Sequence, residues 1–190
     1  MKSISEEKKV FRKEAISARK DLNVEQRENA EREILRKLTD ILKARENASL
    51  LLYASMADEV PTDAIFKTAS DLKRKVYYPK VDGEDIVFYR VSDMAELTAG
   101  YRGIREPSES GERYCGKDAD NIIIVPGCAF SADLCRLGYG GGYYDRFLRT
   151  HQRLFKIGIC YPVQLYERIP TENHDIRMDQ IVSGLKEWMN

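Results

Sequence analysis

Cysteine and histidine are scarce in this sequence of 190 residues. There are two histidines, His151 and His174, and the cysteines show no C-x-x-C spacing. The four cysteines are Cys115, Cys128, Cys135 and Cys160. This set does not match a zinc site, and we expect free thiols, buried or at the surface. No Gly-x-Ser-x-Gly segment is present, and so few histidines argue against a serine hydrolase.

An excess of charge of either sign is also absent. Lys and Arg together number 31, as do Asp and Glu, so composition gives no reason to expect nucleic acid or membrane as a partner. No apolar run approaches the length of a membrane span, and residues 1–9 are too charged for a signal peptide, so we expect a cytoplasmic protein. No repeat, low-complexity segment or linker divides the chain, which predicts one domain over residues 1–190.

The hydrophobic pattern changes from helical to alternating along the chain. Apolar residues recur at helical spacing over 5–20 and 24–44, and another helix is predicted over 62–72. The predicted strands cover 50–53, 76–78, 86–89, 121–125, 155–160 and 180–183. This order predicts an α/β fold: a three-layer, mostly parallel, Rossmann-like sheet flanked by helices, with ligands at the carboxyl ends of the strands. Residues 100–118 are polar and contain glycines, and we expect this loop to close over a ligand.

Glycines are concentrated in one short segment, Arg136-Leu137-Gly138-Tyr139-Gly140-Gly141-Gly142-Tyr143-Tyr144-Asp145-Arg146. Glycines allow positive φ and close approach of a ligand, and they expose N–H donors to an anion. The spacing is not the dinucleotide fingerprint, and no Gly-Lys-Ser/Thr follows to make a P-loop. The segment therefore predicts a phosphate site without identifying the ligand.

Residues after the glycines strengthen this prediction. A helix beginning at Tyr144 would point its positive N-terminus at a phosphate, and Arg136 could bind the same oxygens with two N–H groups. Asp145 is then a candidate ligand for Mg²⁺, which takes carboxylate and phosphate oxygens. The alternative is structural, because glycine-rich turns before helices are common without a ligand.

The first predicted helix carries basic residues beside its apolar face. At 100° per residue, Lys8, Arg12 and Arg19 lie within about 40° of one another and border the sector that contains Phe11 and Ala15. Charges in that position can overhang a cleft and bind a polyphosphate. Alternatively, they solvate the surface of an exposed helix.

A second polar segment follows the predicted strand 50–53. Thr62 or Asp63 could cap the next helix, which would explain part of the segment structurally. Glu59 is not needed for capping. A carboxylate at the end of a strand could accept hydrogen bonds from N–H groups of a ligand.

Three segments together resemble the 5-formyltetrahydrofolate cyclo-ligase family, also called 5,10-methenyltetrahydrofolate synthetases. They are Lys8-x-x-x-Arg12 followed by Arg19, then Tyr53-Ala54-Ser55-Met56-Ala57-Asp58-Glu59-Val60-Pro61-Thr62, and Val125-Pro126-Gly127-Cys128-Ala129-Phe130 running into Arg136 to Asp145. They occur in the family's order and span most of the chain. The family commonly has Phe-Asp-x-x-Gly where this chain has Phe130-Ser131-Ala132-Asp133-Leu134, and we expect Asp133 to supply the missing acid.

The resemblance implies ATP-dependent closure of 5-formyltetrahydrofolate to 5,10-methenyltetrahydrofolate, with ATP and Mg²⁺ required and the folate, polyglutamylated or not, as small-molecule substrate. It implies catalytic roles for Arg136, Tyr143 and Asp145. It implies a folate site at Ala54, Glu59 and Tyr143, and metal ligands at Asp145 and Asp179, with Asp175 as the alternative to Asp179. The implied ATP-binding residues are Lys8, Arg12, Arg136, Leu137, Gly138, Tyr139, Gly140, Gly141, Gly142, Tyr143 and Tyr144.

Two other functions fit the same residues. A sugar-phosphate or acyl-CoA enzyme on a similar sheet could use the glycines for phosphate without hydrolysing ATP. A noncatalytic module could use the basic first helix to recognise RNA or an acidic partner. The oligomeric state is not predicted by any of these patterns.

Overall fold

The centre of the protein is a seven-stranded mixed sheet with the order β12-β11-β9-β6-β1-β2-β3. The computed structural model describes residues 3–116, 120–172, 174–184 and 187–189. The sheet strands are β1 (Leu50–Leu51), β2 (Val76–Asp82), β3 (Asp85–Val91), β6 (Ile122–Val125), β9 (Phe155–Cys160), β11 (Gln180–Ser183) and β12 (Glu187–Met189). The five inner strands are parallel, and the two edge strands β3 and β12 are antiparallel to their neighbours. The predicted α/β class with a mostly parallel sheet is confirmed.

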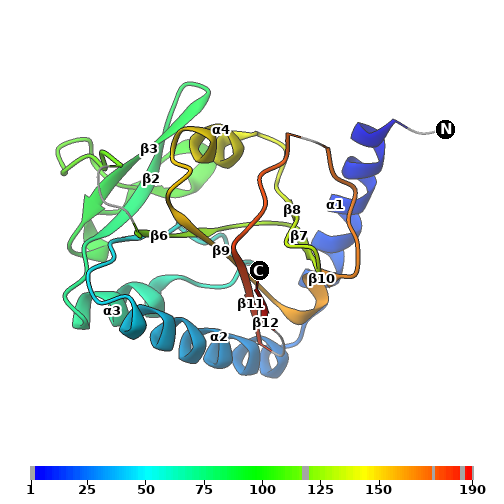
Figure 1. Ribbon diagram of the computed structural model, residues 1–190, viewed down its shortest axis with the longest axis horizontal. Coiled ribbons are helices and arrows are strands. Elements are labelled where there is room, and N and C mark those ends of the chain that lie inside the picture. Colours follow the sequence, from blue (N-terminus) through cyan, green and yellow to red (C-terminus); the bar gives the residue numbers. More distant parts are fainter. Residues whose placement is uncertain (1–2, 117–119, 173, 185–186, 190) are drawn as a thin grey trace.

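Helices cover both faces of this sheet (Figure 1). α2 (Val24–Ala44) and α3 (Asp63–Asp71) pack on one face, α4 (Tyr143–Thr150) lies on the other, and α1 (Ile4–Lys20) stands beside the sheet. Capping boxes that pair Ser3 with Glu6 and Asn23 with Gln26 fix the starts of α1 and α2. Thr62 is at the N-cap of α3, but its hydroxyl donates to the carbonyl of Tyr53 at 2.7 Å and so does not cap the helix.

The inner strands are buried on both faces, as their continuous apolar sequences predict. Successive residues of one strand enter opposite halves of the core: Ile122 and Ile124 contact the layer of α2 and α3, whereas Ile123 and Val125 contact the layer of α4. None of these four side chains is more than 1% exposed. The sheet is therefore a rigid base for the loops that leave its carboxyl edge.

Short elements that were not predicted complete the fold. A three-stranded sheet with the order β10-β7-β8 packs its apolar side chains against α1. Its strands are β7 (Ala129–Ser131), β8 (Arg136–Leu137) and β10 (Leu165–Tyr166), and a two-stranded ladder joins β4 (Thr98–Ala99) to β5 (Arg105–Glu106). The remaining turns of helix are η1 (Met94–Glu96), η2 (Tyr101–Gly103) and η3 (Pro162–Gln164). The predicted loop 100–118 thus contains η2 and β5, and its residues 117–118 lie outside the described residues.

The path of the chain through the sheet reverses between β1 and β6. β1 is followed by β2 and β3 on one side, and β6 is followed by β9, β11 and β12 on the other. Two loops that leave adjacent strands in opposite directions open a crevice between them, which is where α/β sheets bind ligands. The segment after β1 contains Glu59. The segment after β6 leads to residues 138–142, which we call the glycine loop.

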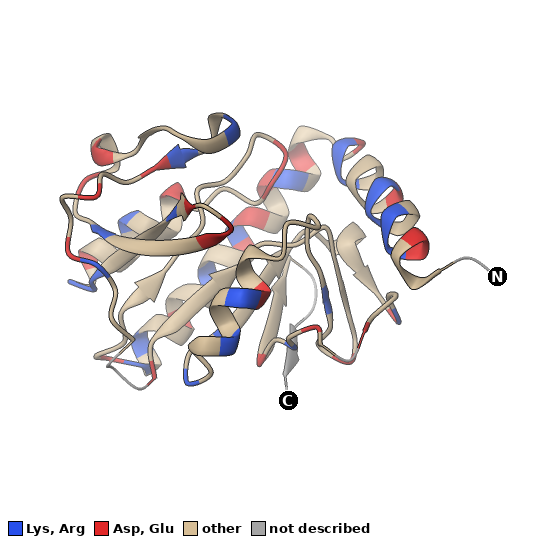
Figure 2. Cartoon of the chain, turned by 90° about the horizontal axis from the view of Figure 1, so that it is seen from above, with Lys and Arg blue, Asp and Glu red and all other residues tan. Residues whose placement is uncertain are grey.

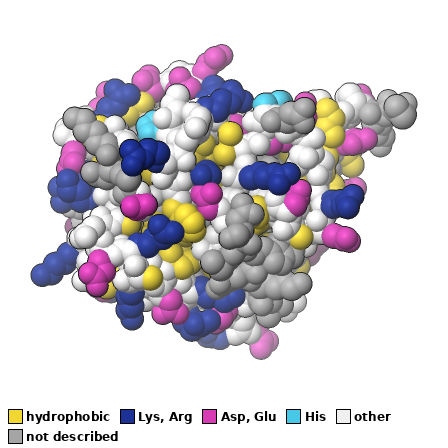
Figure 3. Space-filling model, in the orientation of Figure 1, with side chains coloured by type: hydrophobic (Ala, Val, Ile, Leu, Met, Phe, Trp, Pro, Cys, Tyr) yellow, Lys and Arg dark blue, Asp and Glu magenta, His cyan; other side chains and the backbone are white. Residues whose placement is uncertain are grey.

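Charged side chains of both signs are interspersed among the described residues. Blue Lys or Arg and red Asp or Glu residues alternate along α1 in Figure 2, and positive and negative side chains are interspersed on the face shown in Figure 3. No helix among the described residues is long and apolar enough to cross a membrane. The prediction of free thiols is confirmed: Cys115 is exposed, and Cys128, Cys135 and Cys160 are buried.

Candidate active site

A cavity of about 490 Å³ lies at the carboxyl ends of β1 and β6. It collects residues from α1, from the segment after β1, from the glycine loop and from the start of α4. The predicted site residues that line it are Lys8, Arg12, Ala54, Glu59, Arg136, Leu137, Gly138, Tyr139, Gly140, Gly141, Gly142, Tyr143, Tyr144 and Asp145. Asp179 is not among the lining residues.

The glycine loop joins β8 to α4 along one wall of the cavity. Gly140 and Gly142 have φ values of +98° and +71°, which side chains rarely tolerate. A Cβ on Gly138 would lie 2.7 Å from Nη1 of Arg136, so this glycine allows the arginine to pack against the loop. α4 begins at Tyr143, and Gly142 at its N-cap has no side chain to bond the first amides. Those amides can therefore donate to an anion.

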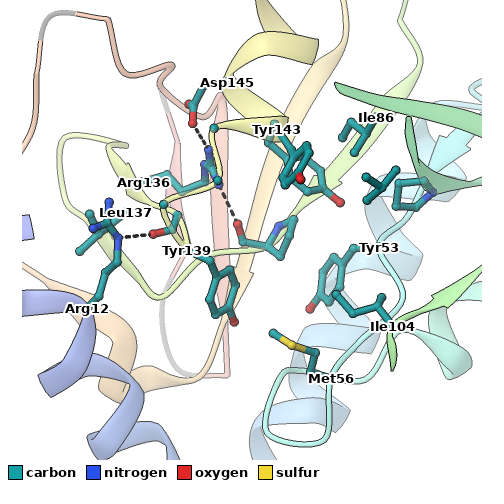
Figure 4. Close-up of a pocket in the computed structure, with 18 of the residues that line it drawn as sticks. Arg12, Tyr53, Met56, Ile86, Ile104, Arg136, Leu137, Tyr139, Tyr143 and Asp145 are labelled. Carbon is teal, nitrogen blue, oxygen red and sulfur yellow. Dashed lines mark hydrogen bonds and ion pairs between the residues drawn. The ribbon is translucent and has the colours of Figure 1, made fainter. Parts of the chain in front are cut away.

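Arg136 is held under this loop by hydrogen bonds from two of its three nitrogen atoms. Its Nη1 donates to the carbonyl of Pro126 at 3.0 Å and its Nη2 to Oδ2 of Asp145 at 2.9 Å (Figure 4). Its Nε is buried and has no hydrogen-bond partner among the described residues. A buried guanidinium N–H without an acceptor is costly, and a phosphate oxygen is a suitable acceptor.

α1 contributes two basic side chains, Lys8 and Arg12, to the wall of the cavity. Nζ of Lys8 contacts carboxylate oxygens of Glu172 at 2.8 Å and Asp175 at 2.6 Å. Burial lowers the pKa of Lys8, but the two carboxylates raise it more, so its pKa lies above the ordinary value. Nε of Arg12 donates to the carbonyl of Gly138 at 2.7 Å. The alternative that these residues only solvate an exposed helix is wrong, since both line the cavity.

The two candidate acids of the C-terminal segment are placed differently. Asp179 precedes β11 and binds Lys156, with its Oδ2 2.7 Å from both the amide N and Nζ of that residue. The amino end of β11 is opposite the carboxyl edge where the cavity opens, so the choice of Asp179 over Asp175 as a metal ligand is not supported. Asp175 lines the cavity. Glu172, His174 and Asp175 also form a cluster whose ligand atoms lie within 4.8 Å of one another.

Glu59 lines the cavity between Met56 and Tyr139, with 7% of its surface exposed. Its Oε2 accepts the amide N–H of Met56 at 2.9 Å, and its Oε1 accepts the hydroxyl proton of Tyr139. Burial raises the pKa of this carboxyl above its ordinary value, against the lowering effect of the two hydrogen bonds and of Arg19. Each oxygen keeps a lone pair for a donor from a ligand.

Most of the cavity wall that was not predicted is apolar, although Ser5, Arg102, Glu106, Glu172 and His174 also line it. Figure 4 shows Tyr53, Met56, Ile86 and Ile104 together on the side away from Arg12 and Arg136. Further lining residues there are Pro79, Val81, Tyr101 and Arg102. The two-residue loop Gly83-Glu84, with glycine at its first position, is a hairpin signal, and it pairs Val81 with Ile86. No comparable signal points to Tyr101 or Ile104.

Two tyrosines at the start of α4 lie between the polar and apolar halves. The ring of Tyr143 meets that of Tyr101 edge to face at 6.3 Å, so the 100–106 segment reaches the cavity. The hydroxyl of Tyr144 is buried and lacks a hydrogen-bond partner in the described part of the chain. Burial raises the pKa of Tyr144, so this hydroxyl stays protonated. Aromatic rings in this position can stack on a planar ligand.

The turn before β8, where the sequence departs from the family pattern, is well defined. Leu134 has a φ of +64°, a conformation that costs a residue with a side chain about 1–2 kcal/mol relative to glycine. Its side chain is 3% exposed and belongs to the core, which offsets that cost. The hydroxyl of Ser131 donates to Oδ1 of Asp133 at 2.5 Å. An acid is therefore present in this turn at position 133.

Comparison with known proteins agrees with this arrangement. The model of the 5-formyltetrahydrofolate cyclo-ligase family matches residues 4–184. A probable 5-formyltetrahydrofolate cyclo-ligase of Schizosaccharomyces pombe is 30% identical over 173 residues, which cover 83% of this chain and 85% of that protein. The 5-formyltetrahydrofolate cyclo-ligase of Haemophilus influenzae is 26% identical, with 95% and 99% covered.

Solved structures give the same result. The chain is similar to the NMR structure of the 5,10-methenyltetrahydrofolate synthetase of Aquifex aeolicus, with 34% identity, a TM-score of 0.82, and 96% of this chain and 92% of that chain covered. The family model, the relatives and this structure all match over most of the chain. The chain therefore belongs to the 5-formyltetrahydrofolate cyclo-ligase family.

Proposed function

We propose that this protein closes 5-formyltetrahydrofolate to 5,10-methenyltetrahydrofolate at the expense of ATP, releasing ADP and phosphate. The observation that carries this proposal is one cavity with two unlike halves. One half has a glycine loop, a helix N-terminus and three basic side chains, and the other half has a buried carboxylate among aromatic and apolar residues. The first suits a triphosphate and the second suits a pterin.

The chemistry requires the formyl oxygen to become a leaving group. In the proposed route this oxygen attacks the γ-phosphorus and the bond to ADP breaks, giving an iminium phosphate. N10 then attacks the formyl carbon and loses its proton, and the C–O bond breaks to release phosphate. Phosphoryl transfer of this kind depends mainly on positioning and on neutralising charge at the phosphoryl oxygens.

The basic residues are arranged for that neutralisation. We assign Arg136 and the amides of 138–142 to the transferring phosphoryl group, because these residues line the same cavity. Lys8 and Arg12 are assigned to the rest of the triphosphate. Lys8 contacts Glu172 and Asp175 in this structure. A phosphate oxygen would therefore either share Lys8 with those carboxylates or displace them from it.

The donor set also fits a hard divalent cation. Asp145 lines the cavity with 23% of its side chain exposed, and Oδ2 is the oxygen engaged by Arg136. We propose that Asp145 holds Mg²⁺ together with phosphate oxygens and that Asp175, rather than Asp179, is the second carboxylate near it. When bound, Mg²⁺ would withdraw charge from the phosphate oxygens.

The folate is assigned to the other half of the cavity. Glu59 would accept the paired N–H groups of the pterin on its free lone pairs, and Ala54 would form part of the wall. Tyr143 would lie at the boundary between nucleotide and folate, where its ring contacts Tyr101. These assignments bring the formyl group toward the glycine loop.

The test is formation of the methenyl product, followed by its absorbance. Purified protein is mixed with 5-formyltetrahydrofolate, with ATP and Mg²⁺ supplied together and each withheld in turn. We expect product only when both are present. Absence of product from folded protein that binds ATP would overturn the proposal and favour a phosphate-binding function without ring closure.

A further inference from the structure

A chain of hydrogen bonds connects α1 to the folate half of the cavity through the glycine loop. Nη1 of Arg19 lies 2.7 Å from the hydroxyl oxygen of Tyr139, and that hydroxyl contacts Oε1 of Glu59. An arginine has no acceptor atom, so Arg19 donates to the tyrosine oxygen. The single proton of Tyr139 is therefore directed at Glu59. Arg19 is 2% exposed and Glu59 is 7% exposed, whereas Tyr139 is 40% exposed, so the two charged groups at the ends of this chain of bonds are shielded from water.

We propose that Tyr139 is a positioning residue: its hydroxyl fixes the carboxylate of Glu59 for the pterin, and its place in the glycine loop links nucleotide binding to folate binding. This inference rests on the proposed function for the identity of the two ligands.

The backbone around Glu59 is held by other contacts. The amide N–H of Glu59 donates to the carbonyl of Met56 at 3.0 Å, and Nη1 of Arg27 donates to the carbonyl of Asp58 at 3.4 Å. Arg19 also binds the carboxylate of Asp58, at 2.7 Å and 3.2 Å. Removing the hydroxyl of Tyr139 would therefore leave the 56–59 segment in place and release only one oxygen of the Glu59 carboxylate.

The same residue belongs to the anion-binding wall. Tyr139 lies between Gly138, whose carbonyl accepts a bond from Arg12, and Gly140, whose positive φ sets the direction of the loop. A phosphate bound to the loop amides would fix this backbone and with it the tyrosine ring. Nucleotide binding should then favour the Glu59 position that binds folate, so each ligand tightens the binding of the other.

The decisive variant is Tyr139→Phe in the full chain, which keeps the ring and removes the hydroxyl. We expect the KM for 5-formyltetrahydrofolate to rise about tenfold, because a buried charged group loses a partner, with a smaller change in kcat and in the KM for ATP. Tyr166→Phe is the matched control: it removes a hydroxyl from a tyrosine that packs against Phe11 of α1 outside the cavity, and it should leave all three constants unchanged.

Calorimetric titration separates positioning from a general loss of structure. The affinity for 5-formyltetrahydrofolate is measured with and without a non-hydrolysable ATP analogue and Mg²⁺. We expect the analogue to tighten folate binding in the natural protein and not in Tyr139→Phe. Combining Tyr139→Phe with Glu59→Gln should weaken binding little beyond Glu59→Gln alone, because both changes act on one interaction.

Additive effects of the two substitutions, or an unchanged influence of the analogue in Tyr139→Phe, would overturn the inference. So would an equal rise in the KM for ATP and for folate. The binding measurements require no turnover. If the protein binds both ligands without forming product, the proposed reaction is wrong, and the binding measurements still test the role of Tyr139. A protein that binds no 5-formyltetrahydrofolate would overturn both.

Discussion

Glu59 is a carboxyl group whose burial opposes its own ionisation. The groups that face it are Arg19 of α1, Asp58 beside it, Tyr139 of the glycine loop, the amide of Met56, and the nearby Tyr53 and Tyr144. Burial is the largest effect, and the net pKa lies above the ordinary value. The proposed function needs the charged form, which accepts two N–H groups at once.

Acid should therefore weaken folate binding before it affects other steps. As the pH falls through the raised pKa of Glu59, the carboxyl gains a proton and loses an acceptor site, so the KM for 5-formyltetrahydrofolate should rise while kcat changes less. Initial rates over the mildly acidic range, corrected for reaction without protein, measure this. Glu59→Gln should give a high KM with no such acid dependence. A flat KM for the natural protein would contradict the assigned role of Glu59.

Asp145 and Asp179 make a matched pair for testing the metal assignment. Asp145 lines the cavity and contacts Arg136, whereas Asp179 contacts Lys156 away from it. Asp145→Asn should lower kcat/KM by about 100-fold or more at saturating Mg²⁺, since charge stabilisation in the transition state is lost. Asp179→Asn should keep turnover near that of the natural protein.

The measurement is turnover as a function of Mg²⁺ concentration for both variants, with circular dichroism to confirm folding. Asp175→Asn should raise the Mg²⁺ concentration needed for half-maximal rate. A larger loss of turnover from Asp179→Asn than from Asp145→Asn, in a folded protein, would show that the metal assignment is wrong.

α1 is attached to the rest of the protein mostly by polar contacts. Lys8 binds Glu172 and Asp175 near one end of the helix. Arg12 binds the glycine loop from the middle, and Arg19 binds Asp58 near the other end. Apolar contact is limited, with Ala15 the hydrophobic residue of this helix that is fully buried. A helix held in this way depends on the charge state of its partners.

The attachment of α1 should accordingly depend on pH at both extremes. Burial raises the pKa of Asp175, but Lys8 lowers it more, so its contribution is present above the ordinary Asp pKa and is lost as the pH falls through the lowered value. The pKa of Lys8 is raised, so its contribution is present below the ordinary Lys pKa and is lost as the pH rises through the raised value. Hydrogen-exchange protection of α1 should be greatest between these limits.

Exchange of α2 in the same sample is the internal control, because its buried face packs into the main core and should stay protected. Asp175→Asn should abolish the acid dependence of α1 while leaving that of α2 unchanged. If α1 and α2 lose protection together at every pH, α1 is not a separate unit of stability.

At the level of the whole molecule, the strength of the sequence pattern decided what could be predicted. The helix over 24–44 and the strands over 155–160 and 180–183 have the predicted bounds, and the helix has a long periodic apolar pattern. The glycine loop and the segment after β1 were both expected at carboxyl ends of strands, and both line the cavity.

What the sequence did not predict depends on the folded path of the chain. β7, β8 and β10 have two or three residues each, too few for a periodic pattern. Asp175 and Asp179 lie four positions apart, and only the course of the chain into β11 separates the cavity from Lys156. Tyr101 reaches the cavity through the β4–β5 ladder, a tertiary contact without a local signature.

Because the strand order reverses between β1 and β6, the two halves of the cavity come from different parts of the chain and can be redesigned separately. The 56–59 segment and the β2–β3 hairpin lie on the β1 side of this reversal and contribute to the apolar wall. The glycine loop and α4 follow β6, on the other side of the reversal. A library confined to Met56, Val81, Ile86 and Ile104 would alter ligand preference without touching the phosphate wall. Such a library must retain Tyr139, because its hydroxyl bonds Glu59 and so connects the two halves of the cavity.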